Sequence, residues 1–75
     1  MRRSQARSQL LALYGAEVAG KSAVLKKLLS CTYILMYRGY LQLATWHPVT
    51  LKLSPEGRAI AAELYKDGYR PEHAV

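Results

Sequence analysis

The middle of the chain changes from a helical to an extended rhythm, which limits the folds that the chain can adopt. In YLQLATW, residues 40–46, alternate residues from Leu41 share one face. In VTLKLS, residues 49–54, every second residue from Val49 is apolar. A period of two is typical of half-buried strands, and only a His-Pro dipeptide separates these stretches. We therefore expect a hairpin, with a looser loop than Asn-Gly or Asp-Gly would favour.

Apolar residues at helical spacing predict helices before this hairpin. The first should run from Ser4 to Tyr14 and end at Gly15. After a loop that includes Lys21, Ser22 is expected to cap a second helix. The apolar stripe of that helix would consist of Val24, Leu25, Leu28 and Leu29.

The following stretch, SCTYILMYRG, is open to two interpretations. A single long helix could run from Ser22 to Arg38, because the helical spacing continues. Alternatively, the chain breaks near Ser30 and begins a third helix that Ser30 or Thr32 caps and Gly39 ends.

The segment Ser54-Pro55-Glu56 predicts the start of a last helix. Serine is a preferred N-cap, proline suits the first turn, and glutamate faces the positive end of the helix dipole. This helix should extend to Tyr65, with Gly68 closing it. We thus expect an α+β fold of three helices, a two-stranded hairpin and a C-terminal helix. It forms one domain over residues 1–68, with a tail at 69–75.

The composition indicates a small basic protein. The chain has 75 residues and a net charge of +6, a balance often found in proteins that bind a polyanion. Its single cysteine, Cys31, rules out an internal disulfide, so we expect a cytoplasmic setting. We expect neither a membrane span nor a signal peptide.

The stretch GAEVAGKS, residues 15–22, has the spacing of a phosphate-binding P-loop. In a P-loop, however, a buried strand delivers the glycine turn to a helix. Here the preceding SQLLALY is predicted to be helical, so we expect no nucleotide cofactor. Instead, Gly15 should end one helix, and Gly20-Lys21-Ser22 should begin the next, where a nucleic-acid phosphate could bind.

Catalysis finds little support in the residue types present. His47 and His73 have no nucleophile beside them in the sequence, and no Cys/His cluster has the spacing of a zinc site. We expect no enzyme activity and no metal. Cys31 and Trp46 are expected in the core, and His47 in a turn.

The stretch GYLQLATWHPVTLKLSPEGRAIAAEL, residues 39–64, resembles the second half of a winged helix-turn-helix domain. The resemblance rests on Gly39-Tyr40-Leu41, where a recognition helix passes into the wing, and on the helix start Leu53-Ser54-Pro55-Glu56-Gly57-Arg58. The stretch resembles the small transcriptional regulators of the multiple-antibiotic-resistance type and their relatives. The resemblance implies double-stranded DNA binding, with a recognition helix at about residues 31–38. We expect a homodimer, because one short domain reads too few base pairs for tight specific binding.

The resemblance and the basic composition together give a set of expected nucleic-acid contacts. These are Arg3, Arg7, Lys21, Lys26, Lys27, Thr32, Tyr33, Tyr37, Arg38 and Lys52. The expected recognition helix is short, and it lacks the Asn and Gln that commonly read base edges. Its apolar residues Ile34, Leu35 and Met36 therefore leave open an alternative, a protein-interaction module that docks on a larger enzyme or polymerase.

Overall fold

The computed structural model describes residues 3–71, and for residues 3 and 4 it describes the backbone alone. In chain order the elements are α1 (Arg3–Val18), α2 (Ser30–Tyr37), β1 (Leu41–Thr45), β2 (Thr50–Leu53) and α3 (Pro55–Lys66). The expected α+β class with a two-stranded antiparallel hairpin is confirmed. The expected order is wrong in one respect, because two helices, not three, precede the hairpin within residues 3–71.

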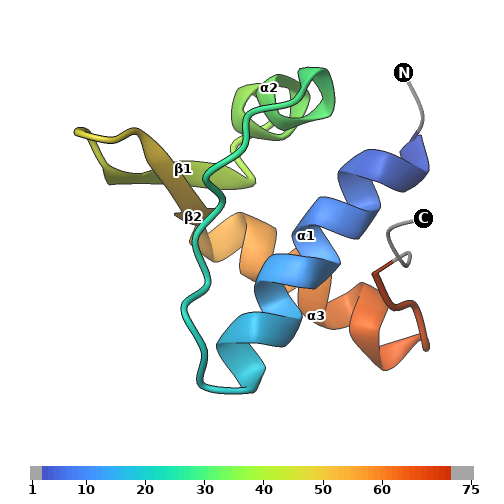
Figure 1. The fold of residues 1–75 in the computed structure, drawn as a ribbon. Coiled ribbons are helices and arrows are strands. Elements are labelled where there is room, and N and C mark those ends of the chain that lie inside the picture. Colours follow the sequence, from blue (N-terminus) through green and yellow to red (C-terminus); the bar gives the residue numbers. More distant parts are fainter. Residues whose placement is uncertain (1–2, 72–75) are drawn as a thin grey trace.

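The helices surround one core from which the hairpin projects to one side (Figure 1). Helices α1 and α3 pack against each other, and α2 packs on α1 next to β1. Leucine side chains from α1, α2 and both strands meet Ala61 of α3 in the centre. The buried cluster is Leu10, Leu13, Leu35, Leu41, Leu51, Leu53 and Ala61. No helix in residues 3–71 is long and apolar enough to cross a bilayer.

Residues 22–29 are not the helix that the leucine spacing predicts. Helix α1 continues through Gly15 and ends near Gly20, whose φ of 73° is left-handed. The chain is then extended, and Leu25 exchanges two backbone hydrogen bonds with Leu51 at 2.7 and 3.0 Å. These bonds pair the N–H and carbonyl groups of Leu51 on the edge of β2 that faces away from β1. A helix at residues 22–29 would leave these groups without a partner.

The helix at α2 follows the second of the two interpretations. The chain breaks before Ser30, and α2 ends at Tyr37, with Gly39 in the left-handed region at φ 80°. The Thr32 hydroxyl accepts a hydrogen bond from the Leu29 backbone N–H at 2.9 Å. Thr32 therefore caps the helix from inside its first turn, where it satisfies a backbone donor that precedes the helix.

The hairpin pairs Leu41 with Leu53 and Leu43 with Leu51, and its register shifts between Leu43 and Thr45. The expected alternation of burial holds over Leu51, Lys52 and Leu53, but it fails at Thr50, which is buried, and at Leu43 and Val49, which are exposed. Leu43 lies opposite the fully buried Leu51, so the difference is between the strands: β2 lies between β1 and the segment at Leu25, whereas β1 pairs on one side only among the described residues.

The start of α3 is joined closely to the chain between α2 and β1. Ser54 caps α3 by accepting from the Gly57 N–H at 3.0 Å, and its hydroxyl donates to the Gly39 carbonyl. The Ser54 N–H also donates to the Tyr40 carbonyl at 3.1 Å. A Cβ atom at Gly57 would overlap that carbonyl, so only glycine permits this approach.

The beginning of the expected tail packs on the helices. The Tyr69 N–H donates to the Leu64 carbonyl at 3.0 Å. The Arg7 guanidinium lies 4.5 Å from the centre of the Tyr69 ring, and Arg70 lies 3.6 Å from that of Tyr65. Residues 72–75 lie outside the described part.

We predict that Gly57→Ala lowers the free energy of unfolding by about 2–3 kcal/mol, because the new methyl group must displace backbone. Gly15→Ala is the matched control, since a Cβ there meets nothing within 4 Å. In the interior of α1 it should instead stabilise by about 0.5–1 kcal/mol. Urea unfolding followed by circular dichroism measures both. Equal effects of the two substitutions would contradict the close approach at Gly57.

Candidate nucleic-acid interface

The segments around α2 and the hairpin carry only positive charge. No Asp or Glu occurs between Glu17 and Glu56, whereas this stretch contains Lys21, Lys26, Lys27, Arg38 and Lys52. The Glu17 carboxylate lies 2.6 Å from the Arg58 guanidinium, across α1 and α3. The acidic groups of the described residues thus lie in α1, in α3 and at Asp67 just after α3, and the segment from Val18 to Pro55 has none.

Two lysines are brought together by the pairing of the extended segment with β2. Leu25 lies opposite Leu51 in an antiparallel bridge. In that register Lys26 is a neighbour of Thr50, and the next residue on the same face of β2 is Lys52, one diagonal step away. Both lysines are exposed, as is Lys27. Sequence patterns could not reveal this proximity, because residues 22–29 were expected to be helical.

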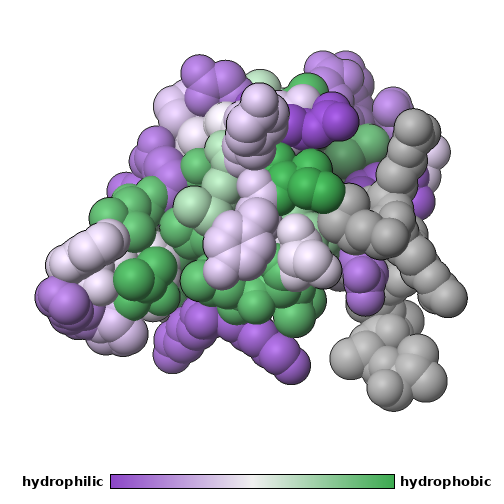
Figure 2. Space-filling view, turned by 90° about the horizontal axis from the view of Figure 1, so that it is seen from above, coloured by the Kyte–Doolittle hydropathy of each residue, from purple (hydrophilic) through white to green (hydrophobic). Residues whose placement is uncertain are grey.

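Helix α2 exposes aromatic and apolar side chains, not charged ones. Tyr33 and Tyr37 are 56% and 93% exposed and, four residues apart, they share one side of the helix. Ile34 and Met36 are each more than one-third exposed. Figure 2 looks down on the molecule from the α2 side, and it shows apolar side chains gathered in the middle of this face with hydrophilic ones around them.

Thr32 does not belong to this surface. It is fully buried, and its hydroxyl donates to the Gln9 side-chain oxygen at 3.0 Å while capping α2. The Cys31 thiol, also buried, donates to the same oxygen at 3.4 Å. The burial of Cys31 agrees with the sequence prediction. The burial of Thr32 removes it from the side chains that can reach a nucleic acid, so its expected contact is corrected to a structural role.

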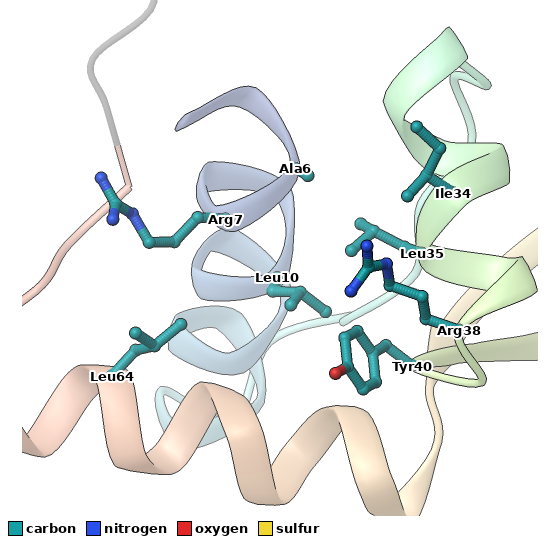
Figure 3. Close-up of a pocket in the computed structure, with 8 residues that line it drawn as sticks. All are labelled: Ala6, Arg7, Leu10, Ile34, Leu35, Arg38, Tyr40 and Leu64. Carbon is teal, nitrogen blue, oxygen red and sulfur yellow. The ribbon is translucent and has the colours of Figure 1, made fainter. Parts of the chain in front are cut away.

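The expected arginine contacts lie apart from the lysines. Arg38 caps the end of α2, is exposed, and extends toward α1, whereas Arg7 extends from α1 toward the segment after α3 (Figure 3). Arg3 begins α1, but its side chain lies outside the described part. Lys21 is exposed just beyond the end of α1. The predicted contacts therefore form separate groups and not one continuous stripe.

The tip of the hairpin exposes Trp46, so the expectation that Trp46 lies in the core is wrong. Its side chain is 64% exposed, and its ring stands edge-on to His47 with centroids 5.7 Å apart. His47 lies in the turn as expected, and the His47-Pro48 peptide bond is cis. The tip of the hairpin projects beyond the helices (Figure 1), and this position leaves Trp46 exposed.

The P-loop-like stretch, residues 15–22, lies at the wrong end of a helix to bind a phosphate. Gly15 lies inside α1, and Gly20 and Lys21 follow the end of that helix. The Lys21 N–H donates to the Ala16 carbonyl at 2.9 Å. The stretch thus surrounds a helix C-terminus, which carries the negative end of the dipole. Since no helix begins at Ser22, the expected phosphate site at a helix start is wrong.

Among the described residues, no group of three or more His, Cys, Asp or Glu side chains could hold a metal ion. Comparison with protein-family models, with curated proteins and with solved structures found no match.

We predict that Thr32→Val destabilises the fold by about 1–3 kcal/mol, because it leaves the Leu29 N–H without its partner. Tyr37→Ala, on the exposed side of the same helix, should change stability by no more than about 0.5 kcal/mol. Thermal unfolding by calorimetry compares them. A Thr32→Val variant as stable as the unaltered protein would contradict the capping role.

Proposed function

We propose that this chain is a small winged-helix DNA-binding protein, with α2 as its recognition helix and the β1–β2 hairpin as its wing. The supporting observation is the surface of the hairpin and the extended segment, which carries Lys26, Lys27 and Lys52, and the chain has no carboxylate between Glu17 and Glu56. A surface of one sign attracts the phosphate backbone from a distance and releases counterions on binding.

Binding should depend mainly on the backbone of the DNA. Lys26 and Lys52 share one face of the extended segment and β2 and would contact neighbouring phosphates. The exposed residues of α2 include tyrosines but no Asn or Gln. Contacts to phosphate set position and affinity, and side chains at base edges set sequence preference. We therefore propose binding with low sequence specificity, which a homodimer would strengthen.

The test is the salt dependence of binding to a labelled random duplex, measured by fluorescence anisotropy. Affinity should fall steeply with salt. For Lys52→Gln, the slope of log K against log salt should decrease in magnitude by about 0.9, as for one lost phosphate contact. Lys66→Gln is the charge-matched control, because Lys66 lies exposed in the last turn of α3.

Two outcomes of this titration would count against DNA binding. The first is no change in anisotropy at low salt. The second is an equal decrease in slope for Lys52→Gln and Lys66→Gln, which would indicate attraction by net charge alone.

The exposed apolar side chains of α2 favour a second candidate, a protein-interaction module of the same fold. Tyr37 is 93% exposed, and Met36 and Ile34 beside it are 39% and 37% exposed. Aromatic residues and methionine are enriched at the centres of protein interfaces. A photo-crosslinking amino acid in place of Tyr37 should then capture one partner in cells. The same amino acid in place of Lys66 is the control, and adducts no different from it would exclude this candidate.

A further inference from the structure

A groove lies between the three helices, away from the lysines of the proposed DNA surface. It is open to solvent on one side and has a volume of about 640 Å³, in the range of sites for small organic ligands. Its lining comes from every helix and from the segment before β1 (Figure 3). The lining residues are Ala6, Arg7, Leu10, Ile34, Leu35, Arg38, Tyr40 and Leu64.

The lining combines aliphatic walls with positive charge. Ala6 and Leu10 on α1 face Ile34 and Leu35 on α2, and Leu64 of α3 lies toward the other end (Figure 3). Among the described residues, the lining of the groove includes two arginines and no carboxylate. A groove of this composition suits a ligand with an apolar body and a negative charge.

The two arginines are in different situations. The Arg7 guanidinium lies over the Tyr69 ring at 4.5 Å and is directed to the far side of α1 (Figure 3). The Arg38 guanidinium extends toward α1, near Leu35 and Tyr40, and makes no hydrogen bond or ion pair with the other described residues. Arg38 is therefore the cation available to a ligand in the groove.

We propose that this groove binds an aliphatic carboxylate, with Arg38 holding the carboxylate and the leucine walls holding the hydrocarbon chain. The guanidinium matches a carboxylate through two parallel hydrogen bonds. A single available guanidinium suits one negative charge better than a doubly charged phosphate. The walls offer aliphatic contacts along facing helices, which a flexible chain can follow.

The site would connect a small molecule to the surface of α2. Leu35 and Arg38 line the groove, whereas Tyr33 and Tyr37 are exposed to solvent on the same helix. A ligand between α1 and α2 would therefore change the freedom of α2 relative to α1. The binding proposal itself does not depend on DNA binding and can be tested without it.

The test uses decanoate below its micelle concentration, added to the folded full chain and followed by calorimetry and by amide chemical shifts. Decanoate should bind at least about tenfold more tightly than neutral 1-decanol, because a charged hydrogen bond typically contributes a factor of this size. The shifted amides should be those of Ala6, Leu35, Arg38 and Tyr40, while the hairpin tip near Trp46 stays unchanged.

Variants test separately the contribution of the Arg38 charge and that of the apolar walls. Arg38→Gln should remove the preference of decanoate over decanol, whereas Lys52→Gln, an equal loss of charge outside the groove, should keep it. Ala6→Met should weaken both ligands by filling the groove. Equal binding of decanoate and decanol to the unaltered protein, the same loss in both charge variants, or shifts centred on the hairpin would each overturn the proposal.

Discussion

The contact between the start of α3 and the chain at Gly39 and Tyr40 is the constraint on which the rest of the structure depends. The Ser54 hydroxyl accepts from the Gly57 N–H and donates to the Gly39 carbonyl, so one side chain joins the cap of α3 to the exit from α2. The Tyr40 carbonyl, which accepts from the Ser54 N–H, lies where a side chain at Gly57 would be. Since β1 and β2 lie between these two points in sequence, the contact closes the hairpin against the helices.

This closure determines which surfaces are available for function. With the hairpin held at its base, its tip and Trp46 project from the molecule, and β2 offers its other edge to Leu25. That pairing brings lysines of the extended segment to β2. On α2, the side that carries Leu35 packs inward and lines the groove, which leaves Tyr37 outside. The proposed DNA surface and the proposed carboxylate site are thus neighbours on α2 that use different side chains.

Local signals in the sequence predicted the elements that local interactions determine. The cap at Ser54, the end of α2 before Gly39 and the two strands follow from residue types next to one another. Residues 22–29 could not be predicted this way, because their conformation depends on hydrogen bonds from Leu25 to a strand 26 positions later. In the candidate site, too, some features could be predicted from the sequence and others depend on contacts between distant segments. The exposed lysines were predicted from charge, but the burial of Thr32 depends on Gln9 in another helix, and the groove at Arg38 requires three helices to meet.

Native-state hydrogen exchange tests the role of this contact most directly. The amide of Leu51 lies in the centre of the core and should exchange only by global unfolding. If the contact at Ser54 and Gly57 holds the fold together, the Ser54 and Gly57 amides should exchange with the same free energy as Leu51 and the same dependence on denaturant. Exchange of these two amides at the low free energy of a fraying helix end, while Leu51 remains protected, would contradict the account.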